Sequence, residues 1–281
     1  MKKNLLGLTL SLCILAVSGM SSCTQTNENT IIIGLECNYA PFNWTTPTSS
    51  EHTLPIANSA GNYADGYDIN FAKKLSSALN VEVQVMKLEW TSLISNLNTN
   101  VIDCIIAGMT DNEERRQSIS FSEEYYRSEL VLVVKKDIAD SHQNIMEATD
   151  LSTLLNGKYI ESQMSTVTDD VIDTLSTNYG ANHSTPVDSF AHAANDVKQG
   201  LVFAMTAEYP VAQSIVNSNT DLGIIRMNQE ILGVDLSSLG VSIGVRKDDT
   251  ELQTKLNSVL ADYSSEDRFA DMTAAISRSG E

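Results

Sequence analysis

The chain has 281 residues, and its 36 acidic against 18 basic side chains give a formal net charge of −18 at pH 7. This excess of acid argues against a nucleic-acid-binding protein, because phosphates are bound by clustered lysine and arginine, and it disfavours a protein that lies flat on an anionic membrane. The apolar fraction of 42% and the charged fraction of 19% predict a packed globular protein with room for two domains.

The N-terminal residues read as a targeting signal. A short basic start precedes an apolar run over 5–17, which is too short for a comfortable membrane span, and small residues then lead to Cys23. This ending resembles a bacterial lipobox, in which the cysteine becomes the lipidated first residue. Cleavage near Ser22 that releases a soluble product is the alternative. We expect a lipoprotein signal peptide and lipobox over 1–23 and a polar tether over 24–30.

The first half of the remaining chain alternates between strand and helix patterns. Strands are predicted over 31–35, 81–86 and 101–108, helices over 66–79 and 90–98, and a Thr/Ser/Asn-rich loop over 43–65. This βαβαβ order predicts a parallel sheet covered by helices.

The second half repeats the alternation. Strands are predicted over 130–136, 158–162, 201–206, 222–227 and 239–247, and helices over 168–177, 189–199, 210–217 and 250–276. The chain thus contains two α/β units without a low-complexity linker. The apolar strands at 130–136 and 239–247 are expected to cross between the units, and two crossings make a cleft that opens and closes as a hinge.

Polar residues follow the predicted strands, where open α/β sheets bind ligands. Thr110 offers a hydroxyl and an N–H just ahead of a helix N-terminus, which suits an anion. Arg115 lies in the first turns of that helix, where acids are favoured, and its guanidinium can bond a carboxylate with two N–H groups. The alternative is a surface arginine that pairs with Asp111 or Glu114.

The cysteines and histidines give no metal or redox signature. Cys37 and Cys104 either form a disulfide, as an exported pair can, or remain two buried free thiols. The four histidines share no ligand spacing, so no metal and no cofactor are expected.

Several segments in order carry a resemblance to a known family. Thr110 is followed by Arg115 five residues on and by Phe121-Ser122 six further, and the remaining motifs are GLECNYAPFNW (34–44), GYDINFAKKL (66–75), the segment 89–126, LVLVVKK (130–136), TAEYPVAQ (206–213) and GVSIGVRKDD (240–249). Over roughly 30–277 the chain resembles the type 2 periplasmic solute-binding proteins of polar amino acid ABC transporters, bacterial extracellular solute-binding family 3.

The resemblance implies the fold. It is an α/β, two-lobed periplasmic-binding-protein (Venus flytrap) fold, in which two mixed α/β lobes are joined by two hinge strands. Lobe 1 would comprise 31–128 with 246–281, and lobe 2 would comprise 129–245. The hinge segments would lie near 127–134 and 239–246.

The resemblance also implies residues that hold the main-chain groups of an amino acid. Arg115 would bind the α-carboxylate with the hydroxyl and N–H of Thr110, and the carbonyl of Gly108 would accept from the α-ammonium. Glu208 stands where the family often has an aspartate that binds the ammonium.

A turn in the second lobe would add a contact to the carboxylate. The family's Gln-x-Gly-Thr turn is Gln163-Met164-Ser165-Thr166 here, with serine in place of glycine at the position where the backbone approaches the ligand. Thr166 would offer N–H and hydroxyl groups.

Side-chain specificity would fall to Glu36, Tyr39, Trp90 and Gln163. Tyr39 and Trp90 match positions that sandwich the ligand side chain, and Glu36 matches an acid that accepts from its nitrogen. A carboxylate in a closed cleft rejects another carboxylate, so we expect arginine, lysine, histidine or glutamine. The alternatives are that Trp90 is a core residue and that Glu36 pairs with a protein cation.

The expected function is that of an extracytoplasmic substrate-binding lipoprotein of an ABC importer. It would have no catalytic residues, would act as a monomer, and would deliver its amino acid to permease transmembrane subunits that work with a cytoplasmic ATPase. A lipid on Cys23 would anchor it to the outer face of the bacterial cell membrane, the periplasmic side in a Gram-negative cell. The alternatives are a ligand-sensing module for a separate signalling partner and a cyclohexadienyl-dehydratase-like enzyme, for which Glu36 would be the candidate acid or base.

Overall fold

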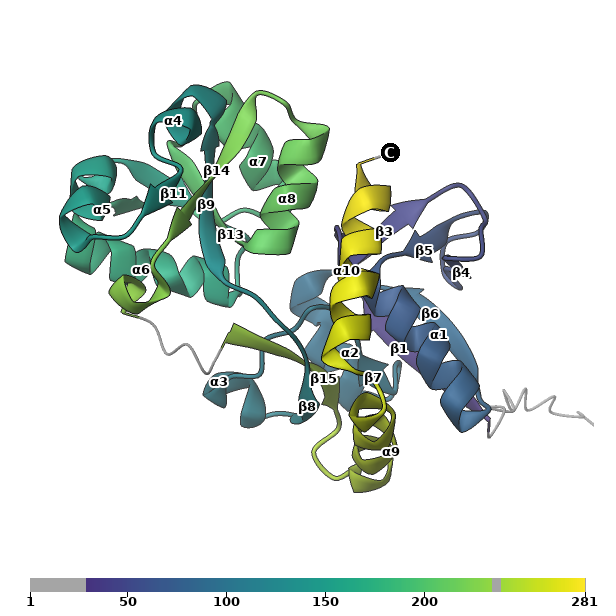
Figure 1. Cartoon of the computed structure of the whole chain (residues 1–281). Coiled ribbons are helices and arrows are strands. Elements are labelled where there is room, and N and C mark those ends of the chain that lie inside the picture. The colour runs from purple at the N-terminus through teal and green to yellow at the C-terminus, as the bar shows by residue number, and fades with distance from the viewer. Residues whose placement is uncertain (1–28, 234–238, 281) are drawn as a thin grey trace, which may run out of the picture.

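The computed structural model describes residues 29–233 and 239–280, and it has two α/β lobes side by side (Figure 1). The sheet of the first lobe has the strand order β6-β1-β7-β15-β8. Strand β1 is parallel to β6 and β7, whereas β15 is antiparallel to β7 and β8. The strands are β1 (Thr30–Leu35), β6 (Glu82–Lys87), β7 (Cys104–Ile105), β8 (Ser120–Arg127) and β15 (Gly240–Val245).

Helices pack around this sheet because their apolar residues recur at helical spacing. Helix α1 (Tyr67–Leu79), for example, buries Ile69, Ala72 and Leu75 on one face. The other helices of this lobe are η1 (Trp90–Ser92), α2 (Leu93–Asn98), α3 (Glu113–Arg116), α9 (Thr250–Ala261) and α10 (Ser265–Ser279).

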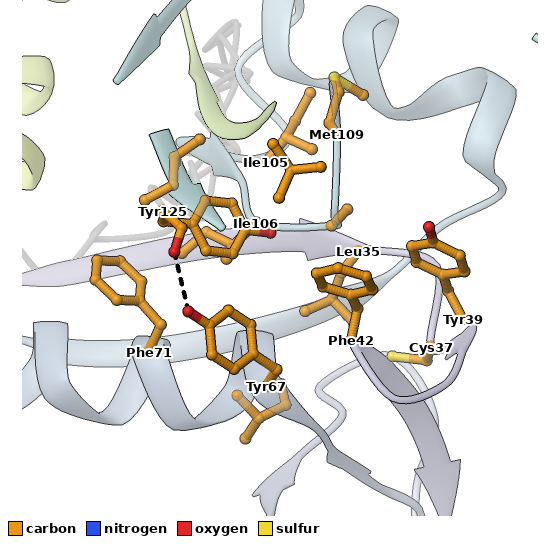
Figure 2. Packing of buried hydrophobic residues seen from close by; sticks show 14 of the residues in the cluster. Leu35, Cys37, Tyr39, Phe42, Tyr67, Phe71, Ile105, Ile106, Met109 and Tyr125 are labelled. Carbon is orange, nitrogen blue, oxygen red and sulfur yellow. Dashed lines mark hydrogen bonds between the residues drawn. The ribbon is translucent and has the colours of Figure 1, made fainter. Parts of the chain in front are cut away.

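The core of the first lobe is rich in aromatic rings and reaches the edge of the sheet (Figure 2). The Tyr67 hydroxyl donates to the backbone carbonyl of Tyr125 over 2.9 Å. The Tyr125 hydroxyl in turn donates to Asp68 over 2.7 Å and accepts from the N–H of Gly108 over 2.8 Å. This buried chain of hydrogen bonds ties the backbone at Gly108, which follows β7, to the packed interior.

The second lobe holds a six-stranded sheet with the order β10-β14-β9-β13-β11-β12. Its strands are β9 (Leu130–Lys135), β10 (Asn144–Ile145), β11 (Tyr159–Glu161), β12 (Asn182–His183), β13 (Ala204–Glu208) and β14 (Leu222–Met227). Its helices are α4 (Lys136–Ser141), α5 (Ala148–Leu155), α6 (Val167–Tyr179), α7 (Phe190–Gln199), α8 (Tyr209–Ser218) and η2 (Gln229–Leu232).

The segment 43–65 is not the loop that its composition predicts. It contributes three strands to a small sheet with the order β2-β3-β5-β4, made of β2 (Asn38–Tyr39), β3 (Asn43–Thr46), β4 (Leu54–Pro55) and β5 (Tyr63–Asp65). Thr45 and Thr46 pair with Ala64 and Tyr63. Threonine is β-branched and suits a strand, although a run of polar residues resembles a loop.

The two apolar strands predicted to cross between the lobes each lie within one lobe. Strand β9 belongs to the second sheet, and β15, assigned in advance to lobe 2, pairs with β7 and β8 of the first sheet. Both strands are almost entirely buried and mostly apolar because both are internal to their sheets, and a strand that is covered on both faces has no solvent-facing side. The connection from β8 to β9 consists of residues 128–129.

Two questions left open by the sequence have structural answers here, and one does not. Cys37 and Cys104 are free, buried thiols. Among the described residues, no helix is both long enough and apolar enough to cross a membrane. The predicted signal peptide and Cys23 lie in 1–28, outside the described residues.

Candidate functional site

A cavity with about 290 Å³ of empty space lies between the two lobes. Only about 10 Å³ of this space is open to the centres of water-sized molecules, which is about the room that one water needs, so the two lobes are packed closely around the cavity. All nine residues that the sequence analysis singled out for ligand binding line it: Glu36, Tyr39, Trp90, Gly108, Thr110, Arg115, Gln163, Thr166 and Glu208. Val167 and Phe190 complete the lining.

Arg115 faces this cavity rather than an acid of its own helix. Its guanidinium donates to the carbonyl of Thr110 over 2.7 Å and to the carbonyl of Ser165, in the other lobe, over 2.9 Å. Of the two alternative partners, Asp111 pairs instead with Arg116, and among the described residues Glu114 forms no ion pair with Arg115. Asn112 is the N-cap of helix α3, and its side chain accepts a hydrogen bond from the backbone N–H of Arg115. This cap fixes the backbone position from which the Arg115 side chain extends.

Trp90 takes part in the same contact between the lobes. Its indole N–H donates to the Ser165 carbonyl over 3.1 Å, and the Arg115 guanidinium lies 5.2 Å from its ring centroid. One carbonyl thus accepts from two side chains of the first lobe. Ser165 holds a left-handed backbone, with φ of 60°, in the position where the family pattern has glycine.

Glu36 and Gln163 form a second contact between the lobes. The Gln163 amide nitrogen lies 3.1 and 3.3 Å from the two carboxylate oxygens of Glu36, and it also donates to the carbonyl of Asp188. Burial raises the pKa of Glu36 to about 7, although the Gln163 hydrogen bond opposes the shift. Within the described residues Glu36 forms no ion pair, so the alternative pairing with a protein cation is not seen.

Glu208 is the second carboxylate of the cavity. It ends β13 and caps α8, and its Oε2 atom is buried without a hydrogen-bond partner among the described residues. Burial raises its pKa, and a hydrogen bond from the Tyr39 hydroxyl opposes the rise. A buried carboxylate oxygen without a partner is costly unless a donor or cation reaches it.

The rings and the glycine beside Glu208 shape the same end of the cavity. Tyr39 stacks on Phe42, with ring centroids 5.1 Å apart (Figure 2). Gly108 has φ of +59°, and a Cβ there would lie 2.6 Å from the Tyr39 ring. Since the N–H of Gly108 is bonded to Tyr125, the carbonyl is the group that it has left to offer a ligand.

Thr166 begins a helix whose first turn meets the cavity. It caps α6, its hydroxyl accepts from the Asp169 N–H, and the same hydroxyl donates toward the carbonyl of Gln163 over 2.7 Å. The expectation that this hydroxyl is free for a ligand therefore does not fit the structure. The N-terminal backbone N–H groups of α6, at Thr166 and Val167, remain a site suited to an anion.

Two lining residues were missed because their sequence signals are those of core residues. Val167 and Phe190 are the first residues of α6 and α7; in the sequence, Val167 directly precedes the helix predicted over 168–177, and Phe190 lies in the helix predicted over 189–199, where it looks like part of the buried face. The cap residue Ser189 before Phe190 marks a helix start, but no signal in the sequence pointed to the cavity.

Comparisons with known proteins identify the family. Residues 31–275 match the model of the bacterial extracellular solute-binding proteins, family 3. The chain is 26% identical over 264 residues to the arginine-binding extracellular protein ArtP of Bacillus subtilis (strain 168), which covers 92% of each chain. It is 25% identical over 266 residues to the histidine-binding periplasmic protein of Escherichia coli (strain K12), which covers 93% of this chain and 92% of that one.

Solved structures share the fold. A mutant of arginine-bound ArgBP from T. maritima superposes with a TM-score of 0.64 at 30% identity, covering 84% of this chain and 96% of that one. An arginine-bound amino acid ABC transporter substrate-binding protein, AbpA from Streptococcus pneumoniae, gives a TM-score of 0.71 at 21% identity, covering 90% and 97%.

Proposed function

Since the chain belongs to the bacterial extracellular solute-binding proteins, family 3, we propose that it captures a free basic amino acid, with arginine as the first candidate, and delivers it to an ABC importer. Lysine and histidine are the next candidates, and glutamine is the amide-bearing one. The proposal concerns reversible capture without a chemical reaction, in keeping with relatives that are solute-binding proteins.

The charge of the cavity is the observation that carries this proposal. Its lining includes two carboxylates, Glu36 and Glu208, and one guanidinium, Arg115. A basic amino acid has the complementary set, with two cationic groups and one carboxylate. Because buried charges are stable only when they are paired, this ligand neutralises the site, whereas glutamate or aspartate would place a second carboxylate beside buried acids.

Each main-chain group of the ligand then has a partner. Arg115 and the first turn of α6 bind the α-carboxylate. Glu208, whose Oε2 atom is otherwise without a partner, binds the α-ammonium with the carbonyl of Gly108. Thr110 supports the carboxylate from the first lobe.

The ligand side chain extends toward Glu36. A guanidinium there replaces the Gln163 amide as the partner of the carboxylate, or shares the carboxylate with it. The rings of Tyr39 and Trp90 provide apolar faces, on which a flat cation is well placed.

Closure follows from contacts made by both lobes. Arg115 and Glu36 belong to the first lobe, while Gln163, Thr166 and Glu208 belong to the second. A ligand that contacts both sets binds the closed form better than the open form, and this difference in affinity shifts the population toward closure. We place the hinge where the chain passes between the lobes at the ends of the predicted segments, at residues 128–129 between β8 and β9 and near residue 239 at the start of β15.

The remaining parts of the proposal concern location and partners. We propose that Cys23 is lipidated and anchors a monomer to the outer face of the cell membrane, where the closed form docks on the permease. Mass spectrometry of the protein from a bacterial membrane fraction, with Cys23→Ala as control, tests the anchor.

Calorimetric titration tests the ligand. Residues 24–281, unfolded and refolded to remove carried-over ligand, are titrated with each of the twenty amino acids. Tight binding of arginine, lysine or histidine supports the proposal. Binding of glutamate or aspartate contradicts the role given to Glu36, and no binding at all contradicts amino acid capture.

A further inference from the structure

Phe190 separates the ligand cavity from a second hollow. The residue is 4% exposed, and it lines both the cavity and a neighbouring groove that is open to solvent. Of the residues that the structure describes, no other lines both.

The wall between the two spaces is built from two rings. Phe190, from the second lobe, packs on Tyr39, from the first, with ring centroids 5.0 Å apart and an interplanar angle of 31°. Tyr39 itself lies against Gly108. The rings therefore meet across the cleft and close it where the lobes come together.

The residues that line the groove show whether the rings of Phe190 and Tyr39 lie at the α-ammonium end or at the side-chain end of the ligand. Asn38 and Ala40, which flank Tyr39, line it together with Val211, Ser214 and Ile215 of α8. Helix α8 begins directly after Glu208, the proposed partner of the α-ammonium. Neither Glu36 nor Gln163, at the side-chain end, lines the groove.

Core packing alone is the plain alternative. Phe190 shares the buried face of α7 with Ala193, Ala194 and Val197, at the spacing expected of a helix against a sheet. A residue that only fills the core, however, borders no open space, whereas Phe190 borders both the cavity and the groove.

We propose that Phe190 is a specificity-determining residue whose ring ends the cavity just beyond the α-amino group, so that the site accepts amino acids with a free α-amino group and rejects those substituted on that nitrogen. The inference rests on the proposed function, because it takes the position of the α-ammonium from it. Truncation of the ring joins the cavity to the groove and gives an N-substituent room.

The test combines truncation of the Phe190 side chain with a ligand that is larger at its α-amino group. Wild type, Phe190→Ala and Phe190→Leu are titrated calorimetrically with arginine and with Nα-benzyl-arginine, whose secondary ammonium keeps its charge for Glu208. Wild type should strongly prefer arginine. Phe190→Ala should reduce that preference by about tenfold or more, within the range by which pocket size discriminates ligands, and Phe190→Leu should stay close to wild type.

Two controls distinguish a role of Phe190 in ligand specificity from a role in core packing alone. Val197→Ala truncates the same buried face of α7 without touching the cavity, and it should keep the wild-type preference. Nω-methyl-arginine, extended at the opposite end, should show the same preference relative to arginine in wild type and Phe190→Ala. If Phe190→Ala fails to fold, Phe190→Val takes its place, with a smaller change in the same direction expected.

The outcomes distinguish the two proposals. An unchanged preference in a folded Phe190→Ala that still binds arginine, or in Phe190→Val where it takes the place of Phe190→Ala, overturns the role of Phe190 and leaves arginine capture intact. An equal change in Val197→Ala also overturns it. A wild-type protein that binds no free amino acid overturns the proposed function, and the inference falls with it.

Discussion

Arg115 and Arg116 are neighbours in sequence with opposite surroundings. Arg115 is half-buried against Trp90 and spans the two lobes. Arg116 is exposed and pairs with Asp111 over 2.6 and 2.5 Å. The alternative considered for Arg115, a surface arginine paired with a nearby acid, describes Arg116 instead. The pair supplies a matched test of the site.

Arg115→Ala should weaken arginine binding by about 2–5 kcal/mol, because the ligand carboxylate then lies buried without its partner. Arg116→Ala should change binding and stability by less than about 0.5 kcal/mol, as surface substitutions usually do. Titration calorimetry and urea unfolding of both variants provide the comparison. Equal losses in the two variants would contradict the placement of the ligand carboxylate at Arg115.

Glu36 should make binding of a basic amino acid dependent on pH. Burial raises its pKa to about 7, so the carboxyl is charged above that pH and neutral below it. A cationic ligand needs the charged form. Affinity should therefore fall as pH drops below about 7, approaching tenfold per pH unit, and binding near neutrality should release a proton.

Titrations from pH 5.5 to 8.5, in buffers of different ionisation enthalpy, measure both effects. Glu36→Gln should bind arginine more weakly and lose most of the slope, while any remaining slope reports Glu208, whose pKa is also raised. The same slope in wild type and Glu36→Gln would show that another group is responsible.

At the scale of elements, the spacing of apolar residues predicted the helices with a regular apolar face and missed a strand whose apolar pattern is interrupted. Helices α1, α6 and α7 lie where the spacing of apolar residues places them. Strand β8 was not predicted because Glu123 and Glu124 interrupt its apolar pattern. The confirmed parts are the family and the two-lobed fold. Most of the nine site residues could be predicted only from the family resemblance. The residues by themselves indicated a ligand-binding role only for Thr110 and Arg115.

The turn between β11 and α6 carries a backbone conformation that its residue does not favour. Ser165 has φ of 60° and an exposed side chain, and the left-handed region costs a non-glycine residue about 1–2 kcal/mol. Ser165→Gly should therefore raise stability by about 0.5–1 kcal/mol, after the greater freedom of glycine in the unfolded chain is subtracted.

Thermal unfolding of Ser165→Gly beside Asn100→Gly checks this expectation. Asn100 has φ of 59°, but asparagine tolerates this region, so its replacement should bring little gain. A destabilised Ser165→Gly would mean that the serine side chain has a role of its own in the turn.

At the scale of the whole molecule, ligand and lobes are coupled. The carbonyl of Ser165 and the amide of Gln163 already join the lobes through Arg115, Trp90 and Glu36. A ligand that adds contacts on both sides should slow amide exchange in two separate segments, around Gly108–Thr110 and around the first turn of α6.

Hydrogen exchange followed by mass spectrometry, with and without saturating arginine, measures this coupling. Helix α4, in the second lobe and outside the cavity lining, should be unaffected, and glutamate at the same concentration should have no effect. Protection confined to one lobe would contradict capture between the two.

The place of β15 in the first sheet has a consequence for how the protein is made. Ribosomes deliver residues in order, and β8 meets its sheet only through β15, which follows more than a hundred residues later. The second lobe, continuous from β9 to η2, is complete before that strand emerges. Until β15 is synthesised, β7 and β8 of the first lobe each have an unpaired edge. We therefore expect the first lobe to be the part of the chain most in need of a chaperone during synthesis.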